Sequence, residues 1–301
     1  MTVSRRLGLI WMRIIRPLAA AVALVLLGSC SAVKLTYNNL DDISYWWIDG
    51  YADLGELQSA QLRDDLTQLL AWHRGNEMPR VAALLQQVQR DAQADTTPEN
   101  VCRFYDQVRE RLDGVRVKAE PAAVNLAMSL SPSQIKHIAA KFDKGNTAWR
   151  RKWMAGTKPE LLDKRLEASV ERAEQFYGTL EERQRAVLRA GMASPHFDAQ
   201  RSYAERLRRQ QDLLQLLRTL IGANGTPQPT AAQATMALRG YLDRSLTSPD
   251  PVYRAYAQAA TLENCQIYAQ LHNSTNSQQR ERAGARIAAY ERDARELARA
   301  L

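Results

Sequence analysis

The clearest helical pattern in the chain lies in LRDDLTQLLAWH, residues 62–73. Leu62, Leu66, Leu69, Leu70 and His73 follow one another at intervals that place their side chains on one face of an α-helix. The residues between them are mostly charged or polar and fit a solvated face. The stretch therefore predicts an amphipathic helix that Gly75 ends.

Similar patterns extend over most of the chain, and no segment alternates convincingly with the two-residue period of a strand. The predicted helices begin near a proline or a polar cap residue. Those starts are Pro79, Thr97-Pro98, Ser131-Pro132, Ser194-Pro195, Ala231, Pro251 and Asn276, and the predicted breaks are 156–159, Gly178 and 223–230. We expect an all-α fold, an irregular multi-helix bundle of largely antiparallel helices.

One phrase recurs at three predicted helix starts. It reads LSPSQ at 130–134, TLEE at 179–182 followed by Gln184, and TNSQ at 275–278. A capping box, in which a cap side chain and a glutamine three residues later satisfy each other's backbone amides, explains the phrase. The phrase also resembles the Leu-Thr-x-x-Gln phrase of helical periplasmic stress chaperones. Its irregular spacing argues against a solenoid.

The N-terminus has the pattern of a bacterial lipoprotein signal. Arg5, Arg6, Arg13 and Arg16 precede an uncharged apolar run over 17–27, and LGSC at 27–30 fits a lipobox that ends in Cys30. The apolar run has about eleven residues, whereas a membrane-spanning helix needs about 20. We therefore expect cleavage after Ser29.

The lipobox predicts where the mature chain resides. A diacylglycerol thioether would form on the Cys30 sulfur and an N-acyl chain such as palmitate on the new amine, with no other cofactor expected. Ser31 favours the outer membrane, so the domain would face the periplasm. The predicted divisions are a signal peptide over 1–29, an acylated aromatic-rich segment over 30–53 and a helical domain over 54–301.

Composition and compartment limit the class of partner. The whole chain carries a formal net charge of +8, of which the four signal arginines contribute half, so the mature chain carries +4. A periplasmic chain does not meet the chromosome, so nucleic acid is not an expected partner. The expected partners are the membrane, through the anchor, and an envelope protein, glycan or lipid.

Two cysteines remain in the mature chain after Cys30. Cys102 and Cys265 lie beside aromatic and apolar residues in predicted helices. An oxidising compartment permits a disulfide between them. The alternative is a pair of buried free thiols.

Aromatic rings and carboxylates are concentrated just after the anchor, at Trp46, Trp47, Asp49, Tyr51 and Asp53. Tryptophan and tyrosine suit a membrane interface or a protein-docking surface. The interpretation ranked first is that Trp46 and Trp47 pack onto the bundle as part of its first helix.

Two further clusters could bind a ligand. Trp72, His73 and Arg74 place a base and an anion-binding group beside a ring, although cations are also typical of a helix C-terminus. Trp149 and Trp153 flank three cations, which suits an anionic glycan, a lipid headgroup or a partner helix. The commoner arrangement is a half-buried tryptophan stripe beside a solvated basic face.

Motifs of catalysis and metal binding are missing from the sequence. The four histidines, His73, His137, His196 and His272, are scattered without the spacing of metal ligands. There is no glycine-rich phosphate loop and no Gly-x-Ser-x-Gly turn. We therefore assign no catalytic residue and no metal site.

These motifs together resemble a known family. The lipobox, YNN at 37–39, WW at 46–47, DGYADL at 49–54, LAWHR at 70–74 and LSPSQI at 130–135 are similar to those of a family of proteobacterial helical lipoproteins of unknown function. The resemblance is densest before Trp153. It implies lipoprotein status and a helical fold, and it brings no catalytic residue.

Two classes of function are consistent with the sequence. The first is a non-enzymatic binding, scaffold or chaperone-like role in the cell envelope. The second is an enzyme or enzyme cofactor that acts on cell-wall or lipid material through Asp49, Asp53, His73 and Arg74. A cleft that joins these four side chains would favour the second class.

Overall fold

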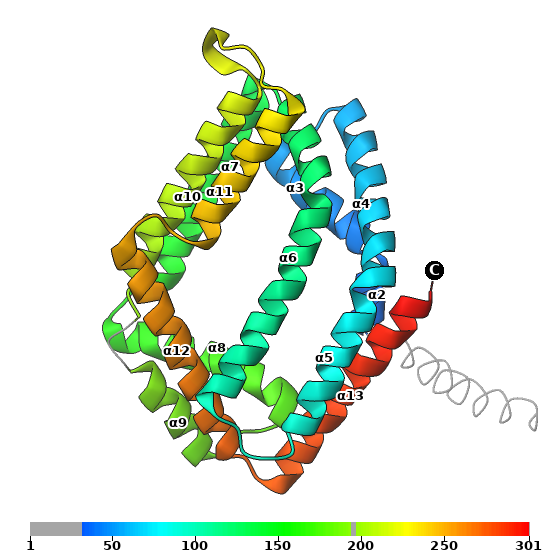
Figure 1. The fold of residues 1–301 in the computed structure, drawn as a ribbon. Helices are drawn as coiled ribbons and strands as arrows, with labels where there is room; N and C mark the ends of the chain where they lie inside the picture. The colour runs from blue at the N-terminus through cyan, green and yellow to red at the C-terminus, as the bar shows by residue number, and fades with distance from the viewer. Residues whose placement is uncertain (1–31, 194–196, 301) are drawn as a thin grey trace, which may run out of the picture. The chain divides into compact units, whose positions relative to one another are not determined.

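The computed structural model describes residues 32–193 and 197–300. Within these residues it contains twelve α-helices and a short 3-10 turn, without a β-strand, which confirms the predicted all-α class (Figure 1). Cys30 and the predicted signal peptide lie outside the described residues, and so does the predicted helix start at Ser194-Pro195.

The chain divides into two compact units, residues 1–40 and residues 41–301. The described part of the first unit is α2 (Ala32–Asn38) with the start of α3. The helices of the second unit are α3 (Leu40–Ala52), α4 (Glu56–Asn76), α5 (Met78–Asp91), α6 (Pro98–Ser129), α7 (Pro132–Trp153), α8 (Lys158–Tyr177), α9 (Glu182–Met192), α10 (Ala199–Leu220), α11 (Ala231–Leu246), α12 (Pro251–Asn273) and α13 (Ser277–Arg299).

The predicted helix starts agree with the structure wherever it describes them. The hydroxyl of Thr97 accepts a hydrogen bond from the backbone N–H of Asn100 at the start of α6, and Ser131 does the same for Gln134 in α7. These bonds satisfy amides that have no partner within the helix. At the far end of α8, Gly178 adopts a φ of 72°, which glycine tolerates without a steric penalty.

The length of α6 was not predicted. This helix runs for 32 residues and includes Pro121 in its interior. Proline has no N–H to donate to the carbonyl of Val117 and normally interrupts a helix. Tertiary contacts with α4, α10, α11 and α12 carry the helix past Pro121 to Ser129.

Two hydrophobic cores lie at different heights along α6. The first joins α6, α7, α10 and α11 around Val124, Ile135, Leu217 and Leu220. The second joins α8, α9 and α12 around Val170, Leu188 and Leu271. The C-terminal half of α6 packs in the first core, whereas its N-terminal end packs on α12, so one helix connects both regions (Figure 1).

A pair of glutamines joins the starts of α4 and α7. The side chains of Gln58 and Gln134 donate to each other's oxygen, at 3.3 and 2.7 Å. Each oxygen also accepts the backbone N–H of its own cap residue, Gly55 or Ser131, at 2.9 and 2.8 Å. Each nitrogen donates to a backbone carbonyl just before the other helix, at Ser129 and Asp53.

The same arrangement recurs between α9 and α13. Gln184 and Gln279 donate to each other at 2.7 and 3.0 Å, and their oxygens accept the backbone N–H groups of Glu181 and Asn276. Their nitrogens donate to the carbonyls of Ser274 and Thr179. We call these two arrangements the glutamine clasps. The third copy of the sequence phrase therefore uses Gln279, one residue beyond the predicted Gln278.

A disulfide joins α6 to α12. Cys102 and Cys265 are bonded, with their Cα atoms 5.5 Å apart and a separation of 163 positions in sequence. Buried carboxylates also form ion pairs between helices near the first core. Glu120 of α6 accepts two hydrogen bonds from Arg239 of α11, at 2.8 and 2.7 Å.

Replacement of Gln184 tests the second clasp. Gln184 is fully buried, and Gln184→Ala would leave the amide of Glu181 and the side chain of Gln279 without these partners. We expect the free energy of unfolding to fall by about 1–3 kcal/mol, the cost of unsatisfied buried polar groups. Urea denaturation measures this change, and Gln175→Ala, an exposed change on α8, is the control. Equal stability of the two variants would contradict a structural role for the clasp.

Thiol labelling tests the disulfide. Protein isolated from its host and denatured without reductant should expose no reactive thiol from Cys102 or Cys265. In the chain-entropy model, a bridge that closes a loop of this length stabilises the fold by about 5 kcal/mol at most. Reduction should therefore lower the urea midpoint of the wild type and leave that of a Cys102→Ala/Cys265→Ala variant unchanged. Two labelled thiols in unreduced material would disprove the bond.

Candidate ligand-binding cleft

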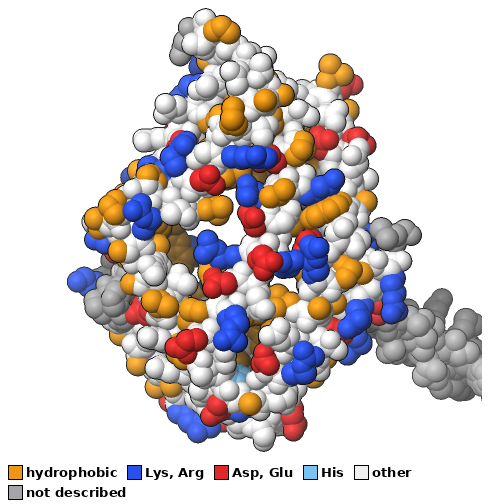
Figure 2. Space-filling view, viewed as in Figure 1, with side chains coloured by type: hydrophobic (Ala, Val, Ile, Leu, Met, Phe, Trp, Pro, Cys, Tyr) orange, Lys and Arg blue, Asp and Glu red, His pale blue; other side chains and the backbone are white. Residues whose placement is uncertain are grey.

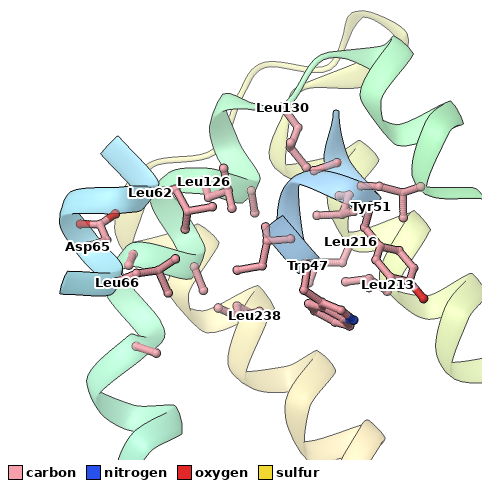
Figure 3. Close-up of a pocket in the computed structure, with 18 of the residues that line it drawn as sticks. Trp47, Tyr51, Leu62, Asp65, Leu66, Leu126, Leu130, Leu213, Leu216 and Leu238 are labelled. Atoms are coloured by element: carbon pink, nitrogen blue, oxygen red, sulfur yellow. The ribbon is translucent and has the colours of Figure 1, made fainter. Parts of the chain in front are cut away.

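A large apolar cleft lies among α3, α4, α6, α7 and α10, with Leu238 of α11 at its wall. Its volume is about 730 Å³, within the range of about 300–1,000 Å³ that is usual for small-molecule sites. Figure 3 shows leucines from α4, α6 and α10 around the space, with Trp47 and Tyr51 of α3 beside them. The leucines that line it are Leu62, Leu66, Leu69, Leu126, Leu130, Leu213, Leu216, Leu217 and Leu238.

The space exists because one wall is built from small residues. Ala119, Pro121, Ala122 and Ala123 lie within about one and a half turns of α6, whereas α4 and α10 line the cleft mainly with leucines. Close-packed interiors leave few voids larger than a water molecule, so an opening of this size needs short side chains on a rigid helix. The alanines of α6 therefore leave a space between the first core and α4.

Polar residues are grouped at one end of the cleft. Gln210 and Arg206 of α10 both hydrogen-bond to the buried Asn146 of α7, whose Oδ1 accepts from Arg206 Nε at 2.7 Å and from Gln210 Nε2 at 3.1 Å. Lys118 of α6 and Gln68 of α4 are further polar lining residues. Asp65 of α4 lies at the edge, beside Leu62 and Leu66 (Figure 3).

The aromatic residues of α3 form part of this cleft. The ring of Tyr51 lies 5.0 Å from that of Trp47 and 6.1 Å from that of Phe142. Trp46 and Trp47 are 63% and 66% exposed, so the prediction that these two rings pack into the bundle is wrong. Tyr45 of α3 is buried instead, and its hydroxyl bonds to Ser59 at 3.1 Å.

The four residues of the enzyme hypothesis do not meet. Asp49 accepts the backbone N–H of Leu54 at 2.9 Å, and Asp53 is exposed in the turn before α4. His73 and Arg74 lie in the last turn of α4. Because α4 rises by 1.5 Å per residue, the start of α4, just after Asp53, and His73 near its end are about 25 Å apart. No common cleft joins these side chains.

The other predicted sites lie outside the cleft. Trp72, His73 and Arg74 are half-buried at the end of α4, and burial lowers the pKa of His73 although the charge of Glu77 opposes the shift. Trp149 and Trp153 are half-buried on α7, and Trp149 stacks on Tyr203 with ring centres 5.3 Å apart. The three cations between the tryptophans are exposed in the last turn of α7, where the helix dipole favours positive charge.

One histidine is part of the second core. The hydroxyl of Tyr177 lies 2.9 Å from His272 Nδ1, and His272 Nε2 lies 2.9 Å from the carbonyl oxygen of Ala94. Because that carbonyl can only accept, Nε2 is the donor and Nδ1 accepts from the tyrosine. Burial lowers the pKa of His272 and raises the pKa of Tyr177 to about 12. This is a structural chain of hydrogen bonds between α8, α12 and the segment after α5.

A second hollow lies between α6 and α12, and Figure 2 shows this part of the surface. It has a volume of about 460 Å³, and Tyr105, Arg109, Tyr253 and Arg254 are among its lining residues. Cationic and acidic side chains are interspersed over this face of the molecule (Figure 2). Two of the lining arginines already have hydrogen-bond partners in the protein. Arg254 donates to the carbonyl of Ser248, and Arg209, which also lines the hollow, donates to the carboxylate of Glu205.

Metal ligands and membrane-spanning helices are not found in the described ranges. No group of histidine, cysteine and carboxylate side chains there could hold a metal ion. None of the helices described combines the length and the apolar character needed to cross a bilayer.

The sequence pointed to Trp47 and Tyr51 but missed the cleft that they line. Its walls come from helices far apart in sequence, and periodicity shows only which face of a helix is apolar, not what that face meets. One signal was present in the sequence, the small side chains of Ala119, Ala122 and Ala123 at helical spacing.

Comparison with protein families shows to which family the chain belongs. The model of the family of unknown function DUF6279 matches residues 50–223, which is more than half of the chain. The chain belongs to this family. The matched region runs from the end of α3 through α10 and so contains nearly all of the residues that line the cleft. No curated protein and no solved structure matches the chain.

Proposed function

We propose that this protein is a lipid-anchored protein of the bacterial cell envelope that binds an apolar ligand in the cleft among α3, α4, α6, α7 and α10, without chemical conversion of that ligand. The observation that supports the proposal is the cleft itself, an opening of about 730 Å³ in the first core lined mainly by leucine and alanine. Burial of apolar ligand surface there would be favourable at about 25 cal/mol per Å².

The position of the cleft suits a binding role. Trp47 lines it and is 66% exposed, so an aromatic ring connects the apolar interior with the surface. Tryptophan suits a boundary between an apolar phase and water, because it has a large apolar body and one polar N–H. Its outward position therefore favours a ligand that arrives from an apolar phase.

The lipobox supports the location. LGSC at 27–30 predicts acylation of Cys30, which precedes the first turn of α2 by two residues. Attachment by two or three acyl chains is durable, whereas a single chain binds reversibly. The domain would then remain at the membrane, with Ser31 favouring the outer membrane and a periplasmic orientation.

A cleft-filling variant tests binding. Ala122→Trp places an indole in the space that Ala122 leaves open. We expect the affinity for the apolar fluorescent probe N-phenylnaphthylamine to fall about tenfold or more, since the added ring occupies ligand volume. The control is Ala148→Trp, an exposed alanine of α7 that does not line the cleft. Failure of the wild type to bind the probe, or an equal loss in both variants, would refute the proposal.

Replacement of Cys30 tests the anchor. Cys30→Ala removes the sulfur that the diacylglycerol transfer requires, so we expect an uncleaved, unacylated precursor. Metabolic labelling with palmitate and partitioning into detergent measure the outcome. Cys102→Ala/Cys265→Ala is the control, because neither sulfur is part of the lipobox. A Cys30→Ala variant that is still acylated and processed normally would disprove the lipoprotein assignment.

A further inference from the structure

The cleft has an apolar end and a cationic end. Gln228, in the loop between α10 and α11, donates to the carbonyl of Met128 at the end of α6, and its backbone lies beside Gly222, just after α10. The C-terminal ends of α6 and α10 therefore lie together. The lining residues run from Lys118 to Leu130 on α6 and from Arg206 to Leu217 on α10. Both series therefore begin with a cation at one end and finish with leucines at the other, about 18 Å away along the helices.

The two cations have no carboxylate partner in the described part of the chain. On α10, Arg201, Arg208 and Arg209 each pair with an aspartate or glutamate, whereas Arg206 bonds to the neutral amide of Asn146. Lys118 is exposed and makes no ion pair among the described residues. Cations left unpaired beside an apolar cavity suit a negatively charged group, because each can gain an ion pair that the protein does not supply.

Asn146 fixes the direction of the arginine. Its side chain is 5% exposed, and Arg206 reaches it through Nε at 2.7 Å. The two terminal nitrogens of the guanidinium have no hydrogen bond among the described residues and can act together on two oxygens of one anion. Asp65 is the carboxylate on the α4 side of the cleft, and it accepts from Gln61 at 3.1 Å.

We infer that the ligand of the cleft is a single-chain amphiphile with an anionic head, the chain lying along the leucines and the head meeting Lys118 and Arg206. This inference rests on the proposed binding function and adds the chemical class of the ligand. The apolar volume takes the acyl chain, and the cationic end limits the choice of headgroup. A carboxylate and a phosphate fulfil the same requirement.

The test compares two lipids that share a myristoyl chain. Lysophosphatidylglycerol has an anionic head and lysophosphatidylcholine a zwitterionic one. Titration calorimetry would use the mature chain from residue 30 with Cys30→Ser and the Cys102–Cys265 bond formed, below the concentrations at which the lipids form micelles. We expect the wild type to bind the anionic lipid about fivefold more tightly, as two partly exposed ion pairs allow.

The variants assign the preference to the two cations. Lys118→Gln and Arg206→Gln should each reduce the preference by about two- to threefold, while Lys136→Gln, an exposed lysine of α7 outside the cleft, leaves it intact. If Arg206→Gln unfolds, the exposed Lys118 still provides the test. Myristate, as a third ligand, distinguishes a carboxylate head from a phosphate head.

The outcomes separate the inference from the proposed function. Equal binding of both lipids by the wild type, or a preference that Lys118→Gln leaves unchanged, would overturn the anionic headgroup while the apolar cleft remains supported. Binding of neither lipid, together with no binding of N-phenylnaphthylamine, would overturn both. A preference that is reduced in Lys118→Gln but unchanged in Lys136→Gln supports the inference.

Discussion

The first backbone amides of a helix have no hydrogen-bond partner within the helix. A helix that starts inside a folded domain therefore needs acceptors from elsewhere, and this requirement shapes the whole domain. The two glutamine clasps meet it with side chains that do two tasks at once. Gln134 satisfies the cap amide of α7 and also reaches Gln58 and the carbonyl of Asp53, so it fixes where α4 begins relative to α7. Gln184 and Gln279 do the same for α9 and α13.

The clasps mark the two hydrophobic regions that α6 connects. One lies next to the first core, where Leu130 precedes the cap of α7, and the other lies next to the second core, where Leu180 precedes the cap of α9. The leucine before each cap packs in the core, and the glutamine hydrogen-bonds to the polar backbone groups beside it. The cleft lies in the first region, where alanines of α6 face leucines of α4 and α10.

Local signals predicted the helices well, because caps and periodicity are properties of neighbouring residues. Thr97, Ser131 and Asn276 were identified as helix starts and act as caps in the structure. The passage of α6 through Pro121 was not predicted, because packing outweighs the local cost of proline there. The exposure of Trp46 and the cleft beside Trp47 also escaped prediction, since both depend on which distant helices meet α3 and α6.

The bond between Cys102 and Cys265 has a consequence for when the cleft is completed. Cys102 lies in the second turn of α6, and the alanines that form the cleft wall lie in the later turns of the same helix. In a newly made chain that has not met an oxidant, only non-covalent contacts hold the N-terminal end of α6 to α12. Oxidation fastens the N-terminal end of α6 to α12, so the redox state of the compartment governs how firmly the wall is held during maturation.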